Sequence, residues 1–165
     1  MNDVKSLAKS FLYAFHGIKW ALCHERNFRI HLTCMFYMFY YLLRYDFFVI
    51  SKSEMCILLL SCALVLGGEL INTGIEKADD TVSKERKKTI AISKDAAAGA
   101  VLIFAVFSVL IGIVIMLQPE AFQLLLNHYV NSPIYILYLV LSLIVALLFI
   151  FKFESLLKFI RGKKK

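Results

Sequence analysis

The segment from Met55 to Asp80 constrains the fold most, because an almost pure hydrocarbon run leads directly into a row of acids. Stepped at about 100° per residue, Glu69, Asn72, Glu76 and Asp80 share one face of a helix. Charge at the bilayer centre costs roughly 2.5–3.5 kcal/mol, so an acid beside such a run is a functional candidate. The alternative, that the acids are only the polar end of a helix entering water, stays open for the last of them. The segment therefore predicts a membrane helix that ends in a polar site.

The composition predicts a membrane protein rather than a soluble one. The chain of 165 residues is 60% hydrophobic, and its mean hydropathy is +0.72, which is too apolar for a soluble domain of this length. The net charge of +7 comes from basic residues at the ends of apolar runs, where anionic lipid headgroups attract them. We therefore expect no nucleic-acid partner. The first 29 residues carry charges throughout, so we expect no cleavable signal peptide.

The hydrophobic periodicity predicts an all-α, polytopic membrane bundle. Residues 1–29 form an amphipathic pattern typical of a helix in the interface plane. Spans are predicted at residues 30–50, 52–80, 94–117 and 134–151, with a short interfacial segment at 119–131. This divides the chain into a surface helix (1–29), a three-span unit (30–117) and an extra span with a basic, amphipathic tail (118–165). The four cysteines show neither CxxC nor zinc spacing, so we expect no disulfide and no metal–thiolate site.

Local signals predict where three of these helices begin. Ser51 and Glu54 fit a capping box at the start of the second span. Ser93 is predicted to cap the third span, with Asp95 in its first turn, where the helix dipole favours an acid. Pro133 fits the first position of the fourth span.

The distribution of lysine and arginine predicts the topology. The N-terminal segment, the three connections and the tail hold 5, 2, 6, 0 and 6 of these residues in turn. The alternation favours four spans with both termini in the cytoplasm. It gathers residues from three segments at the inner face of the cytoplasmic membrane: Glu25, Glu69, Glu76, Asp80, Lys94 and Asp95.

This cluster contains the parts for phosphoryl transfer. Two carboxylates from different helices, with water, can hold Mg²⁺. A lysine at a helix N-terminus attracts phosphate, and a deeper carboxylate can take a proton from a lipid hydroxyl. The chain contains no GxxxxGK[ST], HRD or DFG motif, so no conventional nucleotide fold is expected. The residues alone indicate a polyphosphate–metal site at a membrane interface.

Three stretches together resemble the prokaryotic diacylglycerol kinase and undecaprenol kinase family. They are AFHGIKWALCHERNFRIH (14–31), GELINTGIEKADD (68–80) and SKDAAAGAVL (93–102), and the similarity covers roughly residues 5–117. The resemblance implies a small integral membrane kinase with a surface helix and three spans. It also implies a homotrimer with active sites shared between protomers, which uses Mg-ATP to phosphorylate a lipid alcohol.

The resemblance also implies roles for individual residues. Glu69 would be the general base on the lipid hydroxyl, and Glu25 and Glu76 would hold the metal that bridges the ATP phosphates. Lys94 would contact the phosphates with support from Asp95. The remaining positions it implies are Asn72 and Asp80 lining the site, Tyr13 and Glu85 near the nucleotide, and Phe28 and Arg29 at the lipid entrance. The histidines at 16, 31 and 128 are expected to be interfacial, without a catalytic part.

Two departures from the family pattern and three alternatives stay open. The loop SKERKKTIAISKD (83–95) lacks the aromatic or histidine residue and the second basic residue of the family, and residues 119–165 have no counterpart. The sequence segments ERNFRIH and NTGIEK favour undecaprenol over diacylglycerol as the substrate. The chain could instead be an inactive relative, or a non-enzymatic transporter or assembly factor. A transporter predicts acids on facing helices near the bilayer midplane.

Overall fold

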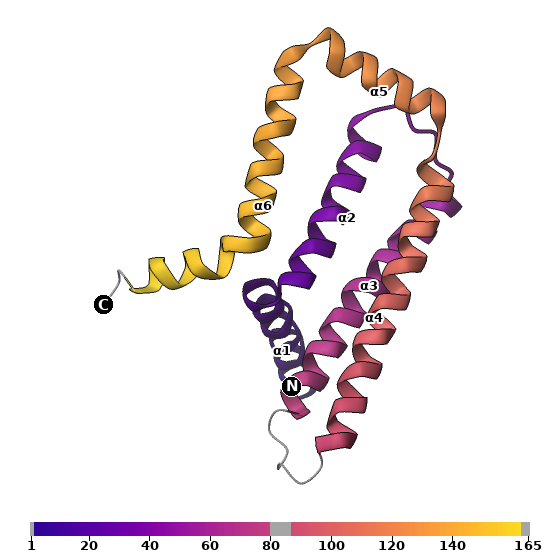
Figure 1. Ribbon diagram of the computed structural model, residues 1–165. Coiled ribbons are helices and arrows are strands. Elements are labelled where there is room, and N and C mark those ends of the chain that lie inside the picture. The colour runs from indigo at the N-terminus through magenta and orange to yellow at the C-terminus, as the bar shows by residue number, and fades with distance from the viewer. Residues whose placement is uncertain (1, 80–86, 163–165) are drawn as a thin grey trace.

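The computed structural model describes residues 2–79 and 87–162 (Figure 1), so Asp80 and Glu85 lie outside the described residues. The described residues form only α-helices and no strand, which confirms the predicted all-α class. The helices are α1 (Asn2–His24), α2 (Arg26–Arg44), α3 (Lys52–Asp79), α4 (Lys87–Met116), α5 (Pro119–Asn131) and α6 (Pro133–Gly162).

Helices α3 and α4 form an antiparallel pair that is the main packing unit (Figure 1). Small residues let the two helices approach closely, as is common in membranes. A Cβ atom at Gly68 would lie 2.9 Å from Cδ2 of Phe104 and 3.6 Å from Cγ2 of Val101. Further along the pair, the Ser108 hydroxyl lies 3.5 Å from the Ser61 hydroxyl. These contacts fix the register between the two helices.

Replacing Gly68 with alanine is expected to destabilise this pair, because the added Cβ requires the Phe104 ring to move. Overpacking of this kind costs about 1–3 kcal/mol. Gly67 is the matched control, since no atom lies within 4 Å of a Cβ placed there. Gly67→Ala should leave stability unchanged or raise it by up to about 1 kcal/mol through helix propensity. Thermal unfolding of both variants in the same detergent measures the difference, and equal midpoints would contradict the close packing.

Three of the helices are long and apolar enough to cross a membrane: α3, α4 from Lys88, and α6 to Ile160. Helix α2, predicted as the first of four spans, is not among them, because arginines, a histidine and tyrosines lower its hydropathy. Figure 1 shows α2 between α6 and the α3–α4 pair, and it contacts both α3 and α6. Its polar side chains are therefore partly covered by protein. Tyr37 hydrogen-bonds Ser142 of α6 at 3.0 Å, and Tyr41 hydrogen-bonds Tyr129 of α5 at 2.9 Å.

The ends of the first two helices differ from the prediction. The surface helix stops at His24 rather than at residue 29, and α2 ends at Arg44 rather than near residue 50. The chain then runs non-helically to Ser51, so its backbone groups need partners outside a helix. Gln118 supplies two of them. Its Oε1 accepts a hydrogen bond from Val49 N at 3.1 Å, and its Nε2 donates one to Val49 O at 3.0 Å.

The predicted start of α3 is confirmed and that of α4 is wrong. Glu54 Oε2 accepts a hydrogen bond from Ser51 N at 2.8 Å, and Ser51 Oγ accepts one from Glu54 N at 3.2 Å, as a capping box requires. Helix α4 already includes Lys87, so Ser93 lies inside it and does not cap it. Residues 87–92 contain no glycine or proline, so nothing in them stops the helix from extending toward its N-terminus.

The helices beyond residue 117 cover one side of α2. Helix α5 begins at Pro119 and spans the segment predicted as a short interfacial one. Helix α6 begins at Pro133, as predicted, and runs as one helix to Gly162. In Figure 1, α5 lies at the opposite end of the molecule from the N-terminus and from the last part of α6. The prediction that the two termini lie on the same side of a membrane stays a prediction.

Candidate active site

Glu69 is the most deeply buried acid of the predicted cluster. It lies on α3 with only 4% of its surface exposed. Its Oε1 lies 3.3 Å from Nε2 of His31, which comes from α2. The bond to α2 gives the buried carboxylate a polar partner, which an isolated acid at this depth would lack. The pair therefore fixes the orientation of Glu69 between α2 and α3.

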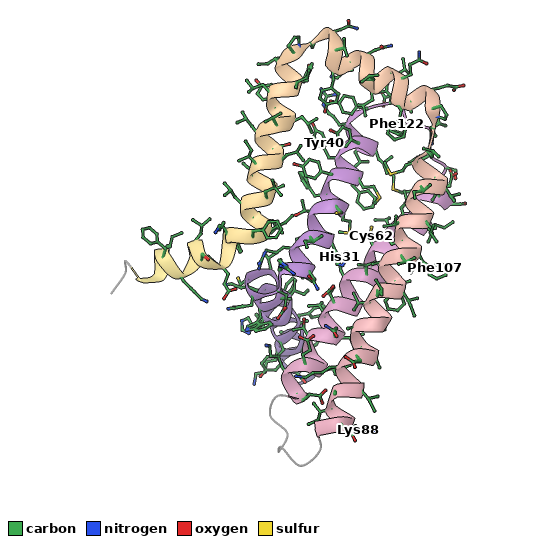
Figure 2. All side chains as sticks on the ribbon, viewed as in Figure 1. His31, Tyr40, Cys62, Lys88, Phe107 and Phe122 are labelled. Atoms are coloured by element: carbon green, nitrogen blue, oxygen red, sulfur yellow. The ribbon has the colours of Figure 1, made fainter. Side chains whose placement is uncertain are left out.

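An apolar cavity of about 390 Å³ extends from His31 along the helices. His31 lines its polar end, and residues of α2, α3 and α4 line the rest: Ile30, Cys34, Met35, Met38, Cys62, Val65, Leu66, Ala105, Ser108, Val109, Gly112 and Met116. Figure 2 shows His31 and Cys62 lying between α2 and the α3–α4 pair. From Ala105 to Met116, α4 advances about 16 Å at 1.5 Å per residue. The cavity can therefore hold a stretch of hydrocarbon chain whose polar end lies beside His31, the partner of Glu69.

Within the next two turns of α3, Asn72 and Glu76 form a second polar group. Asn72 Nδ2 donates a hydrogen bond to Glu76 Oε1 at 3.0 Å. The other amide atom, Asn72 Oδ1, and the Asp79 carboxylate oxygen Oδ2 are buried without a hydrogen-bond partner among the described residues. Buried oxygens normally have partners, so these two are acceptor positions that a bound cation or a donor group can use.

Glu25 occupies the break between α1 and α2. Its backbone is extended (φ −97°, ψ 113°), which turns the chain from the surface helix into α2. Burial raises the pKa of its carboxyl above the ordinary 4.5; Lys77 opposes this change, while the carboxylates of Glu76 and Glu69 add to it. Glu25 therefore lies within electrostatic range of both other acids, as the sequence analysis predicted for this cluster.

The register of the α3–α4 pair places Lys94 at the level of Glu76. Glu76 lies eight residues after Gly68, and Lys94 lies seven residues before Val101, which packs beside Gly68. Lys94 also shares the helix face of Ala97 and Val101, both buried. Lys94 lies inside α4 rather than at its N-terminus, so free backbone N–H groups are not available beside it to bind phosphate. Asp95 is exposed.

Three further predicted residues that the structure describes are not gathered around Glu69. Tyr13 is 71% exposed on α1. Phe28 and Arg29 are buried, and neither lines the cavity beside His31. Arg29 lies where α1, α2 and α6 meet. His31, which is expected from the sequence to be interfacial without a catalytic part, contacts Glu69. Sequence reasoning missed it because the pairing joins two helices, although its place two residues after the ERNFR stretch was a signal.

The donor set fits a magnesium ion held by few protein ligands. Among the residues the structure describes, no group of three or more His, Cys, Asp or Glu side chains could hold a metal. Glu25 and Glu76 are carboxylates that repel each other, and a divalent cation between them would relieve that repulsion. Mg²⁺ commonly binds one or two carboxylates together with water and substrate phosphates. These residues therefore fit Mg²⁺ better than a metal that needs a complete protein cage.

Comparison with known sequences places this arrangement in a family. The sequence profile of the prokaryotic diacylglycerol kinase family matches residues 12–116. The chain belongs to this family. The match includes Glu25, Glu69, Glu76 and Lys94 and ends at the last residue of α4. Helices α5 and α6 lie beyond it.

Two relatives of this kinase family are similar over most of the chain. A protein from Synechocystis sp. named diacylglycerol kinase is 35% identical over 115 residues, which are 69% of this chain and 64% of that protein. A protein from Bacillus subtilis named undecaprenol kinase is 35% identical over 118 residues, which are 70% of this chain and 92% of that protein. The chain thus spans about 64% of the length of the first relative. No solved structure matches the chain.

Proposed function

We propose that the protein is an integral membrane kinase that transfers the γ-phosphate of ATP to the hydroxyl of a lipid, undecaprenol. The observation that carries this proposal is the buried Glu69–His31 pair at the polar end of an apolar cavity. A lipid alcohol requires this combination, since its chain needs an apolar wall and its hydroxyl needs a base. Family membership supports the reaction class.

The residues divide the reaction between them. The Glu69 carboxylate takes the hydroxyl proton as the lipid oxygen attacks the γ-phosphorus and the bond to the bridging oxygen of ADP breaks. His31 holds Glu69 in place. Glu25 and Glu76, the latter held by Asn72, bind the metal, and Lys94 draws the phosphates toward α4. Bound Mg²⁺ supplies neutralisation of the phosphate charge.

We propose that the active protein is a homotrimer in the bacterial cytoplasmic membrane, with both termini in the cytoplasm. The positive-inside rule supports this orientation, since the connection from residue 118 to 133 holds no lysine or arginine. The unpartnered Asn72 Oδ1 and the exposed Tyr13 are compatible with a site completed by nucleotide and a neighbouring protomer. Glu25 directly follows the end of α1 and Glu76 lies three residues before the end of α3, and this placement away from the middle of α3 disfavours an ion path.

Identification of the lipid product tests the function. Purified protein in lipid nanodiscs receives labelled ATP and Mg²⁺ with equal amounts of undecaprenol or diacylglycerol. We expect undecaprenyl phosphate to be the main product, in line with the relative named undecaprenol kinase, which is matched over 92% of its length. Removal of Mg²⁺ with a chelator should abolish the product. Preferential formation of phosphatidic acid would assign the other substrate, and no labelled lipid in either case would refute the kinase proposal.

A further inference from the structure

Arg29 joins three helices through backbone carbonyl groups. Only 3% of its surface is exposed. Its Nε donates a hydrogen bond to Ile150 O of α6 at 3.1 Å, and its Nη1 donates one to Leu22 O of α1 at 3.1 Å. Arg29 itself belongs to α2. One buried guanidinium therefore connects the surface helix, the helix that carries His31 and the last helix of the chain.

Both acceptors have a physical reason to bind a cation. Leu22 lies in the last turn of α1, where carbonyls lack intrahelical partners and the helix dipole favours positive charge. In Figure 1 the yellow end of α6 turns away from the axis of the rest of that helix. A side chain that inserts into the hydrogen-bond ladder of a helix causes a bend of this kind. The Glu154 carboxylate of α6 also lies within electrostatic range of Arg29 and His24.

The same arginine holds the backbone of Glu25. Arg29 N donates a hydrogen bond to Glu25 O at 3.3 Å, and Glu25 N donates one to Ala21 O at 2.8 Å. One backbone hydrogen bond on each side therefore holds the break between α1 and α2. The Arg29 side chain adds a further constraint, because it is bonded to the Ile150 carbonyl of α6. A displacement of α6 would be transmitted to the residue proposed to bind the metal.

We propose that Arg29, by bonding the Ile150 carbonyl of α6, is a positioning residue that sets the place of Glu25, so that the helix added beyond the family match is a working part of the metal–nucleotide site. This inference rests on the proposed role of Glu25. It goes beyond family membership because Ile150 lies outside the matched residues 12–116. Helix α6 is therefore more than a membrane anchor.

The chain contains a probe for this junction. Trp20 is its single tryptophan. The ring stacks on His24 at 4.7 Å between centroids, and the Lys77 ammonium lies 5.2 Å from its centre. Because these partners flank Glu25, binding of metal and nucleotide there should change the Trp20 fluorescence. Titration of the full-length protein with Mg²⁺ and a non-hydrolysable ATP analogue then measures binding without turnover.

The decisive variant is Arg29→Lys, since an ammonium keeps the charge but lacks the planar fork that reaches two carbonyls. We expect the Mg²⁺ concentration at half-maximal fluorescence change to rise about tenfold, as for the loss of groups that orient a metal ligand. The matched control is Tyr37→Phe, which removes the other described α2–α6 hydrogen bond, 3.0 Å to Ser142, away from Glu25. Its titration should equal that of the parent protein.

A second pair of variants perturbs α6 alone. A proline at residue 154 would clash with the carbonyl of Ile150, four residues earlier, so Glu154→Pro should reproduce the Arg29→Lys shift, whereas Glu154→Ala should produce a smaller one. Equal titrations for Glu154→Pro and Glu154→Ala, or for Arg29→Lys and Tyr37→Phe, would overturn the inference. The Glu25→Gln variant distinguishes failure of this inference from failure of the proposed function. If that variant binds Mg²⁺ and the analogue like the parent, the assigned role of Glu25 fails; if only Glu25→Gln loses binding, the positioning by Arg29 fails alone.

Discussion

Replacing Glu69 with glutamine is expected to reduce lipid phosphorylation by about 100- to 10,000-fold, the usual contribution of a general base. Glutamine has nearly the same shape and can still contact His31, but it cannot accept the hydroxyl proton. The apolar cavity is untouched, so binding of the lipid should be unchanged. Binding of Mg²⁺ and nucleotide should also persist, because that part of the site lies two turns away, at Glu76. Rates with labelled ATP, measured alongside Trp20 titrations, separate the two effects.

The control for this prediction is Glu54→Gln on the same helix. Glu54 lies in the capping box at the opposite end of α3, where it bonds Ser51. Its replacement removes one acid from α3 without touching the cavity, so the rate should equal that of the parent protein. A Glu69→Gln enzyme that retains more than about one tenth of the rate would contradict the base assignment, since that loss is far below the usual range.

The sequence could predict features that depend on local chemistry. The Ser51–Glu54 capping box was confirmed because its three-residue spacing and its side chains fully define the contact. The acidic row of α3 follows from helical periodicity alone, and Asn72 bonds Glu76, one turn on, as the periodicity allows. Pro133 marks the start of α6, as predicted, because the geometry of proline suits the first turn of a helix.

Features that depend on contacts between distant segments could not be predicted. The Glu69–His31 pair joins residues of two helices, and the place of His31 just after the ERNFR stretch does not by itself reveal that contact. Ser93 has the chemistry of a helix cap, but the residues before it are compatible with a helix and extend α4 past it. Arg29 resembles an ordinary basic flank, and only the fold shows that its partners are carbonyls of α1 and α6. In each case tertiary structure selected among locally acceptable alternatives.

Glu25→Gln is expected to impair the response of the enzyme to Mg²⁺ and, in the metal-free protein, to maintain or raise stability. Burial raises the pKa of Glu25, with Glu76 and Glu69 adding to it and Lys77 opposing it. The folded chain therefore binds a proton at this site more tightly than the unfolded chain. The Glu25 contribution to stability then declines as pH rises from 4.5 toward the raised pKa, because the ionised form is disfavoured in the fold. Glutamine avoids this loss, so the metal-free variant should unfold at an equal or higher temperature at neutral pH.

The same substitution removes the proposed metal ligand, so the Mg²⁺ concentration for half-maximal activity should rise about 10- to 100-fold or more. In the parent protein, protons compete with Mg²⁺ for Glu25. Because its pKa is raised, the Mg²⁺ requirement should begin to increase, as the pH is lowered, while the pH is still above 4.5. That increase should weaken in Glu25→Gln. Glu120→Gln, on α5 at the opposite end of the molecule, is the matched control and should change neither quantity. An unchanged Mg²⁺ requirement in Glu25→Gln, together with lower stability, would instead make Glu25 a structural residue of the α1–α2 break.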